Sequence, residues 1–401
     1  MHAAGAPPGP DRLYAGSGGY RALAPAAPRL RKRREARNPS PGLAVSALSP
    51  PRRVLVVRAG ALGDTLMVTP LLRALREKFE NAEIDVLCSR LAADILELSP
   101  RVARRFALRY RNLPYALSLE KQRLVRELRS RDYDFAVLLE RVDRYRLLLE
   151  RAGIRKIRSF RETPFDPRAH AIVNNLRAAG FEDGGPRLDM EVFLSDDDRK
   201  RAAELLRDVP GPRIGIHVGY GPRGKKRNQS ERLKGWSSES FTEVAAGLLE
   251  RGRSLVFTGS PEDRGDVEAI LARLPAAGSA VSLAGRTSMR ALAAVIENLD
   301  ALVSVDSGPA HLAAAMGTPL VVLWGPAILE QVRPLSSRSK VTLLRHAPPC
   351  APCYETPLMK TCRRNVCMEA ITPREVLDAV GELLDRSDSM GSVSSARADA
   401  P

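Results

Sequence analysis

A strand–turn–helix–strand pattern that starts at Arg53 limits this chain to few folds. Residues 53–58 are a short β-branched run of the kind found in buried strands. A glycine-containing turn follows over residues 59–63, and Asp64 then opens a helix whose apolar residues share one face. A second buried strand is expected over residues 83–88. This β-α-β unit predicts a parallel sheet and therefore an α/β protein.

The strand and helix patterns continue as two series, which a polar stretch over residues 184–198 separates. Further strands are expected at 135–139, 213–219, 254–259, 301–305 and 320–324. Further helices are expected at 238–250, 262–273, 288–298, 309–316 and 373–386. Two doubly wound domains in tandem place a ligand cleft outside the carboxyl ends of both sheets.

The predicted domains are residues 52–195 and residues 196–386. Tails over residues 1–51 and 387–401 are predicted to be disordered; the first is rich in Pro, Ala and Arg and lacks apolar periodicity. The composition, 44% hydrophobic and 27% charged, is typical of a globular protein. No run approaches the ~18 apolar residues that span a bilayer, and the N-terminus lacks the pattern of a secretory signal. A cytoplasmic location is therefore expected.

The net charge of +16 is unevenly distributed along the chain. Residues 1–53 carry +8 and residues 101–161 carry +11, so the remainder sums to −3. A basic surface attracts phosphate groups on nucleic acids, anionic lipids or phosphorylated substrates, although such residues can equally form a solvated face. Aromatic residues make up only 5% of the chain, and no stacking motif of the kind found in nucleic-acid-binding proteins is interleaved with the basic runs. Nucleic acid is therefore not an expected partner.

The strongest motif spans residues 303–319, where a predicted strand passes directly into a helix through Asp306, Ser307 and Gly308. Ser307 can cap the helix, and Gly308 allows another backbone or a ligand to approach closely. Free N–H groups and the helix dipole make such a turn an anion site, which His311 can face from the first helical turn. On spacing alone, Asp306 and His311 are also consistent with a cap and a buried core histidine.

The second motif is GALGD over residues 60–64. It differs from the dinucleotide fingerprint G-x-G-x-x-G, and residues 88–90 (CSR) stand where the ribose-binding acid would follow the second strand. These two differences disfavour a dinucleotide-dependent oxidoreductase. Asp64 is by default a helix N-cap, but it also follows the first strand at the edge that faces the cleft.

The third motif is a basic loop after Gly219, which ends in Lys234-Gly235-Trp236. Its basic residues are Arg223, Lys225, Lys226, Arg227, Arg232 and Lys234. The loop follows the first strand of the second domain, which favours phosphate contact over a merely solvated run of charges.

In this order the segments resemble glycosyltransferase family 9, the ADP-heptose:lipopolysaccharide heptosyltransferases. The similarity rests on residues 57–66, the segment from Gly219 to Trp236, residues 258–262 (TGSPE) and residues 306–319. It spans residues 52–385 and leaves out only the two tails.

The resemblance implies a GT-B fold, in which two Rossmann-like domains face a central cleft. The N-terminal domain would bind the acceptor, the C-terminal domain would bind the nucleotide sugar, and transfer would invert the anomeric carbon without a metal ion or other cofactor. It implies that Asp64 is the general base and that Gly60 and Gly63 form the acceptor-side turn. The implied donor-binding residues are Gly219, Lys234, Glu262, Asp306, Ser307, Gly308 and His311.

Two departures from the family pattern concern the donor side. The loop between Gly219 and Lys234 is longer and more basic than is usual, so Lys225 or Lys226 can take the phosphate-binding role instead. Ser237 follows Trp236 where proline is common. The implied partners are ADP-heptose, or another nucleotide sugar, and an anionic glycolipid met at the cytoplasmic face of the inner membrane. A monomer is expected.

Four of the five cysteines, Cys350, Cys353, Cys362 and Cys367, are clustered. In a cytoplasmic protein such clustering suggests structural zinc or an iron–sulfur cluster before disulfides, although the spacing matches no standard zinc finger. Reduced thiols without a ligand are the alternative. The fifth cysteine, Cys88, is expected to lie in the core.

Overall fold

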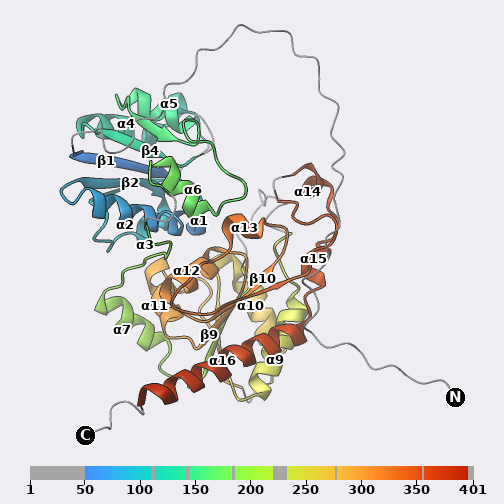
Figure 1. Ribbon diagram of the computed structural model, residues 1–401. Helices are drawn as coiled ribbons and strands as arrows, with labels where there is room; N and C mark the ends of the chain where they lie inside the picture. The colour runs from blue at the N-terminus through green and yellow to red at the C-terminus, as the bar shows by residue number, and fades with distance from the viewer. Residues whose placement is uncertain are drawn as a thin grey trace, which may run out of the picture. The chain divides into compact units, whose positions relative to one another are not determined.

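The computed structural model describes residues 50–109, 113–140, 144–182, 186–219, 233–275, 278–354 and 356–395. All of them belong to one compact unit, residues 43–401. Two parallel sheets organise this unit, each lying between helices as the sequence predicted (Figure 1). The part that carries β1–β5 is called the N-lobe below, and the part that carries β6–β11 the C-lobe. The predicted boundary between residues 195 and 196 stays a prediction.

The N-lobe sheet has the strand order β3-β2-β1-β4-β5, and all its pairings are parallel. Its strands are β1 (Arg53–Arg58), β2 (Glu83–Ser89), β3 (Arg104–Leu108), β4 (Phe135–Leu138) and β5 (Ile157–Ser159). Residues 54–57 of β1 are fully buried, because helices cover both faces of the sheet. This explains why the strand is a continuous apolar run instead of an alternating one.

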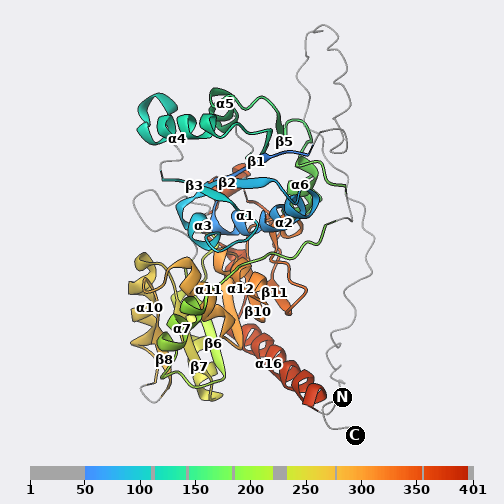
Figure 2. The ribbon, with the colours of Figure 1, turned by 90° about the vertical axis from the view of Figure 1, so that its left-hand side faces the viewer.

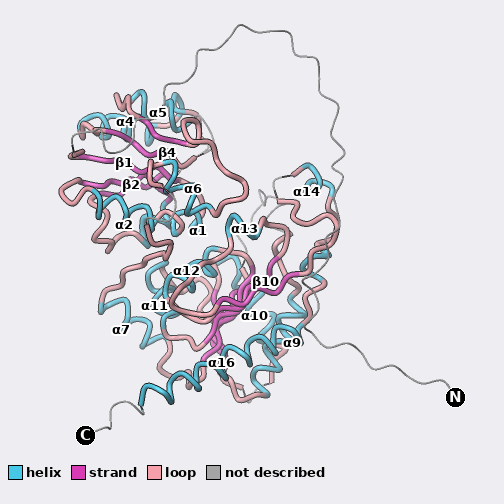
Figure 3. The backbone as a smooth tube through the Cα atoms, in the orientation of Figure 1, coloured by secondary structure: helices cyan, strands magenta, loops and turns pink. Residues whose placement is uncertain are grey.

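The C-lobe sheet has the order β11-β10-β9-β6-β7-β8, also entirely parallel. Its strands are β6 (Arg213–His217), β7 (Ser254–Thr258), β8 (Ala280–Ser282), β9 (Ala301–Val305), β10 (Leu320–Trp324) and β11 (Val341–Arg345). Figure 3 shows the strands of both lobes in magenta with the helices in cyan around them.

Helices connect the strands of each sheet on both of its faces. The N-lobe helices are α1 (Leu62–Leu66), α2 (Thr69–Lys78), α3 (Arg90–Ile95), the 3₁₀ turn η2 (Tyr115–Leu117), α4 (Leu119–Ser130), α5 (Arg144–Arg151) and α6 (Ala171–Ala178). The C-lobe helices are α7 (Asp196–Leu205), α9 (Ser238–Glu250), η3 (Pro261–Asp263), α10 (Arg264–Leu271), α11 (Met289–Glu297), α12 (Gly308–Met316), α13 (Leu329–Val332), α14 (Pro357–Thr361), α15 (Val366–Glu369) and α16 (Pro373–Ser395). No helix in the described part of the chain combines the length and apolarity needed to cross a bilayer.

Three apolar clusters fill the spaces between sheets and helices. One lies between the N-lobe sheet and α4 and α5, which Figure 2 shows on the opposite face from α1–α3. A second lies between the C-lobe sheet and α9, α10 and α16. The third continues from α1, α2 and α3 of the N-lobe into α11 and α12 of the C-lobe, so the two lobes share one hydrophobic core.

Polar contacts reinforce the junction where α3 packs on α11. The Asp94 carboxylate of α3 accepts a hydrogen bond from the Met289 amide at 2.8 Å, at the amino end of α11. The adjacent Arg290 guanidinium lies 3.6 Å from Asp94, 3.4 Å from Glu97 and 3.6 Å from Asp198. Ser288 caps α11 by accepting from the Ala291 amide at 3.2 Å, and Asp94 adds a bond from the other lobe to the first amide of the helix.

Two expectations about helices were wrong. The helix expected to open at Asp64 is two helices, α1 and α2, with a break at residues 67–68. The helix expected over residues 373–386 continues to Ser395, which takes it into the predicted disordered tail. The N-terminal tail itself lies outside the described residues, apart from residues 50 and 51.

Candidate active site

The predicted site residues lie where each sheet reverses its strand order. The neighbours at these points are β1 and β4 in the N-lobe and β6 and β9 in the C-lobe. Connections leave such a point on opposite faces of the sheet, so a crevice opens at the carboxyl ends of the strands. Asp64 follows β1 and Glu140 follows β4, whereas Gly219 follows β6 and Asp306 follows β9. Both crevices therefore carry acidic side chains at their openings.

Asp64 is the third residue of α1, not its N-cap as predicted. The N-cap is Ala61, whose amide donates to Asp64 Oδ2 at 2.9 Å, while Arg58 Nη2 lies 2.8 Å from Oδ1. Burial alone would raise the pKa of Asp64. The Arg58 guanidinium, the Ala61 amide and the nearby His311 outweigh burial and hold that pKa below its ordinary value. Asp64 is therefore a fixed, ionised carboxylate at neutral pH.

The two glycines of the GALGD motif are required by close approaches. A Cβ atom on Gly60 would overlap the Asp64 carboxylate, and one on Gly63 would lie 2.7 Å from His311 Cδ2. Gly60 thus lets Asp64 fold back over the turn, and Gly63 lets α1 pack directly against α12 of the C-lobe. These glycines shape the position of Asp64 instead of providing chemistry.

Arg58 and Glu140 are site residues that sequence reasoning missed. Arg58 Nη1 donates to the Leu139 carbonyl at 2.5 Å, which fixes the guanidinium that pairs with Asp64. Glu140 accepts a hydrogen bond from the Ala59 amide at 2.7 Å and so ties the end of β4 to the turn after β1. Their positions in the sequence could have indicated a role at the site, because each stands at the carboxyl end of a central strand.

Lys234 and Asp306 form a buried ion pair in the C-lobe, with 2.6 Å between Nζ and Oδ2. The ammonium group also lies 4.7 Å from the centre of the Tyr354 ring. Burial opposes the charge on Lys234, but the Asp306 carboxylate outweighs burial and raises the lysine pKa above its ordinary value. The amine therefore stays protonated, and the ring and carboxylate fix its place.

Ser307 and Gly308 begin α12 in a way the sequence predicted only in part. Ser307 occupies the N-cap position but makes no side-chain cap bond; its hydroxyl lies 3.0 Å from that of Ser304. A Cβ atom on Gly308 would lie 3.0 Å from Leu62 of α1. The close approach expected at Gly308 is therefore made by a residue of the N-lobe.

His311 is buried on α12, and its Nδ1 has no hydrogen-bond partner among the described residues. Burial lowers the pKa of His311 to about 4, although Asp306 and Asp64 favour its charged form. The ring is therefore neutral at physiological pH. Its pKa responds to Asp64, Asp306 and Lys234 together, so these four predicted side chains lie close to one another.

The remaining predicted donor residues occupy the ends of β6 and β7. Gly219 has no room for a side chain, because a Cβ there would overlap the Asp263 carboxylate. Glu262 lies in η3 and is exposed, whereas its neighbour Asp263 is 2% exposed and accepts hydrogen bonds from the Ser260 amide and hydroxyl. Glu262 thus faces solvent in this structure, and the carboxylate turned toward Gly219 is that of Asp263.

A cavity of about 430 Å³ adjoins Asp64 and is lined by both lobes. Its polar side chains include Arg58, Asp64 and Glu140, and its aromatic walls are Phe160, Phe165 and Tyr354. The two phenylalanine rings meet edge to face with their centres 5.4 Å apart. Because Tyr354 also contacts Lys234, the cavity ends near the ion pair of the C-lobe.

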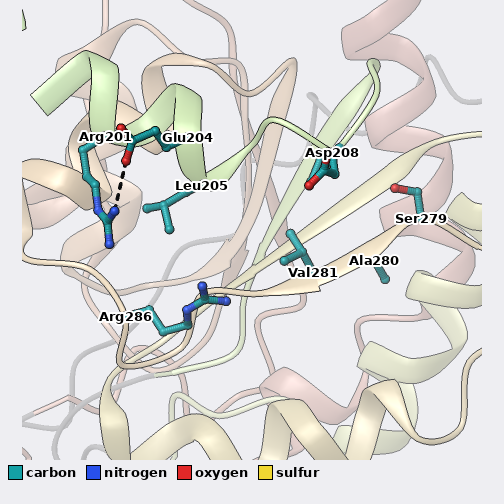
Figure 4. A pocket seen from close by; sticks show the side chains of 9 residues that line it. Arg201, Glu204, Leu205, Asp208, Ser279, Ala280, Val281 and Arg286 are labelled. Atoms are coloured by element: carbon teal, nitrogen blue, oxygen red, sulfur yellow. Dashed lines mark hydrogen bonds and ion pairs between the residues drawn. The ribbon is translucent and has the colours of Figure 1, made fainter.

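A cavity of about 490 Å³ lies elsewhere, beside α7 and the edge strand β8 (Figure 4). Arg201 and Glu204 pair across 3.0 Å at its rim, and Arg286 stands on its opposite side. None of the predicted site residues lines this cavity. We therefore assign the candidate site to the smaller cavity.

The basic loop predicted to contact phosphate lies almost entirely outside the described residues. These undescribed positions are Arg223, Lys225, Lys226, Arg227 and Arg232. Of the basic residues in this motif, Lys234 alone falls within the described ranges. The role of Lys225 or Lys226 stays a prediction.

The clustered cysteines differ in exposure: Cys350 is exposed, Cys362 is intermediate, and Cys353 and Cys367 are buried. Burial raises the pKa of Cys367 to about 11. Within the described ranges no three His, Cys, Asp or Glu side chains are placed to hold a metal ion, so the predicted zinc or iron–sulfur site gains no support. Cys88 lies fully buried in the core, as predicted.

Comparison with known proteins identifies a family and several relatives to which this chain is similar. The model of glycosyltransferase family 9 (heptosyltransferase) matches residues 225–362. Lipopolysaccharide heptosyltransferase 2 of Escherichia coli K12 is 27% identical over 313 residues, which cover 73% of this chain and 88% of that protein. Lipopolysaccharide heptosyltransferase 3 of Escherichia coli is 26% identical over 278 residues, covering 66% and 80%.

Two solved structures share the fold. A family 9 glycosyl transferase from Veillonella parvula DSM 2008 aligns with a TM-score of 0.69 and 20% identity, covering 84% of this chain and 98% of that one. The E. coli ADP-heptose lps heptosyltransferase II aligns with a TM-score of 0.66 and 23% identity, covering 84% and 99%. The predicted GT-B fold is thereby confirmed, and the alternative of an oxidoreductase is set aside. The matched family model and the heptosyltransferase relatives support glycosyltransferase family 9 as the family of this chain, and with it a glycosyltransferase activity.

Proposed function

We propose that this protein transfers a heptose from ADP-heptose to a lipopolysaccharide core acceptor of the lipid A/Kdo type. The N-lobe would bind the acceptor, and the C-lobe would bind the nucleotide sugar. The names of the relatives support the sugar and the acceptor. The observation that carries the proposal is the approach of Asp64, from the N-lobe, to Lys234, Asp306 and His311 of the C-lobe.

In the proposed reaction the acceptor hydroxyl oxygen attacks the anomeric carbon of the heptose. The bond from that carbon to the diphosphate oxygen breaks on the opposite side, so the configuration inverts. Asp64 takes the hydroxyl proton and later releases it to water. Its ionised state, which the Arg58 contact favours, is the state that a base requires.

Departure of ADP leaves negative charge on the diphosphate, which needs compensation. Lys234 is protonated and fixed in place, and α12 directs its amino end toward the same region. We propose that Lys234 and the turn at Asp306, Ser307 and Gly308 hold the diphosphate without a metal ion. Gly219, Glu262 and a hydrogen bond from neutral His311 would complete the donor site.

The acceptor would enter the cavity between Arg58, Glu140 and the aromatic walls of Phe160 and Phe165. Because such an acceptor is anchored in lipid, we propose that the enzyme works in peripheral contact with the cytoplasmic face of the inner membrane. The positive charge of residues 101–161 supports this, since it lies on the acceptor side.

The test is to offer the purified protein a panel of nucleotide sugars with a lipid A/Kdo acceptor and to measure release of ADP, UDP and GDP. We expect acceptor-dependent release of ADP from ADP-heptose. Release of UDP or GDP alone would instead support a family 9 enzyme that uses another nucleotide sugar.

A further inference from the structure

The two most exposed large apolar side chains of the described residues lie close together in sequence on the N-lobe. Leu117 is 72% exposed and Leu119 is 67% exposed, and Leu147 and Leu113 of the same region are 47% and 38% exposed. Leu91 on α3 and Leu358 on α14, each 58% exposed, lie elsewhere. Single exposed leucines are common on proteins, so what matters is how these are held and what surrounds them.

Hydrogen bonds fix the segment that carries these leucines to α4. The Lys121 ammonium, on a residue only 6% exposed, donates to the carbonyl oxygen of Leu113. The Ser118 hydroxyl caps α4 by accepting from the Lys121 amide at 3.2 Å, and Gln122 Nε2 donates to the Ala116 carbonyl at 3.0 Å. The leucines are thus presented outward by a built turn.

Arginines surround the leucines on two packed helices. On α4, Leu119, Arg123 and Arg126 stand at helical spacing on one face, and both arginines are exposed. Neither arginine forms an ion pair with any residue that the structure describes. Helix α5 packs against α4 and adds Leu147 and Arg151. Exposed acids on these helices are fewer, namely Glu127 and Glu150.

This surface lies at the same edge of the sheet as the candidate site. The turn of Leu113 to Leu119 follows β3, and α5 follows β4, so both begin at the carboxyl edge of a parallel sheet. Asp64 follows β1 at that same edge. Anything bound at this surface is therefore presented to the side of the N-lobe where Asp64 lies.

We propose that Leu113, Leu117, Leu119 and Leu147, with Arg123 and Arg126, form a surface that docks the N-lobe on an anionic lipid bilayer. The leucines would enter the interfacial region, and the guanidinium groups would contact lipid phosphates while their stems lie along apolar surface. The inference rests on the proposed function in that a lipid-anchored acceptor gives the docking its purpose. Charge complementarity and the apolar turn together favour a bilayer over a nucleic acid.

Sedimentation with vesicles tests this on the full chain. Vesicles of phosphatidylethanolamine with phosphatidylglycerol are compared with phosphatidylcholine vesicles, at low and high salt. We expect salt-sensitive binding to the anionic vesicles. Each basic residue near such a surface contributes roughly a fivefold factor, so Arg123→Gln with Arg126→Gln should weaken binding ~10-fold or more. Leu117→Ser with Leu119→Ser should weaken it by a similar factor at both salt concentrations.

The controls use exposed leucines and arginines elsewhere on the chain, of which Leu358 is 58% and Leu188 37% exposed. Leu188→Ser with Leu358→Ser removes two exposed leucines, and Arg207→Gln with Arg363→Gln removes the same charge. Both control proteins should bind as the unaltered chain does. Equal loss in test and control variants, or no loss in the test variants, would overturn the inference and transfer the docking role to the N-terminal tail.

A second measurement separates this inference from the proposed function. The leucine variant should transfer sugar to a deacylated, water-soluble acceptor at the unaltered rate, and lose rate only with acceptor embedded in vesicles. Equal loss on both acceptors would mean that the leucines act on the catalytic site, which would overturn the docking role. A chain that binds vesicles as described but uses no nucleotide sugar would overturn the proposed function alone.

Discussion

Gly63 of α1 and His311 of α12 meet across the two lobes so closely that a single added carbon has no room. A Cβ atom at Gly63 would lie 2.7 Å from His311 Cδ2 and 3.2 Å from its Nε2. The next residue along α1 is Asp64, so this contact sets how far the carboxylate stands from the ion pair of Lys234 and Asp306. The packing of the two lobes against each other therefore determines the geometry of the site.

Gly63→Ala tests that relationship. The added methyl should force α1 away from α12, at a cost of ~1–3 kcal/mol in the free energy of unfolding, the range for an overpacked contact. The turnover of Gly63→Ala should also fall, because the displacement of α1 moves Asp64. Urea unfolding and initial rates measure the two effects.

Two further variants make the test of Gly63 specific. His311→Ala combined with Gly63→Ala should recover part of the unfolding free energy lost by Gly63→Ala, because the methyl then has space. Gly265→Ala is the control, since a Cβ there meets nothing within 4 Å. A Gly63→Ala protein as stable and active as the Gly265→Ala protein would contradict the proposed contact.

Asp64→Asn tests the general base. The amide keeps the size of the carboxylate but has no basic lone pair of useful strength, so turnover should fall by ~10²-fold or more. Binding of ADP, measured by calorimetry, should be unchanged because the proposed donor contacts lie on the C-lobe. Near-normal turnover in this variant would remove Asp64 from the mechanism.

Arg58→Gln tests what keeps Asp64 ionised. Arg58 lowers the pKa of Asp64 while burial raises it, so removal of the guanidinium should move that pKa upward. The acidic limb of the pH profile of kcat/KM should shift to higher pH. Arg53→Gln is the control, because Arg53 pairs with Glu83 at 2.8 Å, away from the site. An acidic limb that stays in place in Arg58→Gln would show that Asp64 does not control it.

Much of the fold was predictable because its central strands are buried on both faces. The predicted runs at 53–58, 301–305 and 320–324 coincide with β1, β9 and β10. Strands of a sheet covered by helices on both faces are continuous apolar runs, which are easy to recognise in a sequence. The edge strands β3, β5, β8 and β11 were not predicted, and β5 and β8 are only three residues long, too short for a pattern. Local capping rules likewise failed to distinguish an N-cap from the third helical position at Asp64.

The candidate site was predictable where its residues follow central strands, and not where they come from distant segments. Asp64, Asp306 and His311 stand in motifs at strand ends, so the topology itself brings them together. Tyr354 reaches Lys234 from a segment that follows the last strand of the C-lobe, and no local pattern links the two. Contacts of that kind are set by tertiary packing, which is why the aromatic residues that line the cavity could not be predicted from the sequence.

Lys234→Ala and His311→Ala test the donor site. Each should weaken ADP binding by ~1.5–3 kcal/mol, the range for hydrogen bonds to charged groups, as measured by calorimetry. Unfolding curves check that both variants fold, since His311 is buried. If only Lys234→Ala binds normally, Lys225 and Lys226 become the candidates for the phosphate. Unchanged affinity in both variants would remove this turn from the donor site.

The stability of the protein should fall as the pH is lowered through the range where histidines ordinarily titrate. Burial lowers the pKa of both His217 and His311 from 6.5 to about 4, and it also lowers that of His170. Between those two pKa values the unfolded chain binds protons that the folded chain does not, so protons favour unfolding. The contribution of the neutral rings is therefore complete above pH ~6.5 and declines toward pH ~4.

The magnitude and the controls make this pH dependence testable. The loss is up to about 3 kcal/mol for each of His217 and His311, because one pKa unit corresponds to about 1.4 kcal/mol. Urea unfolding at pH 7.5, 6.5, 5.5 and 4.5 measures the slope; these values span roughly the titration range of histidine. His217→Gln should reduce the slope of the unfolding free energy against pH, because it removes one of the two buried histidines. The Nδ1 atom of His217 lies 3.0 Å from the Thr258 hydroxyl. His346→Gln is the control at an exposed histidine, since that side chain is 45% exposed. A slope that is the same in all three proteins would show that His217 can be protonated in the folded state, and that the carboxylates control the acid sensitivity instead.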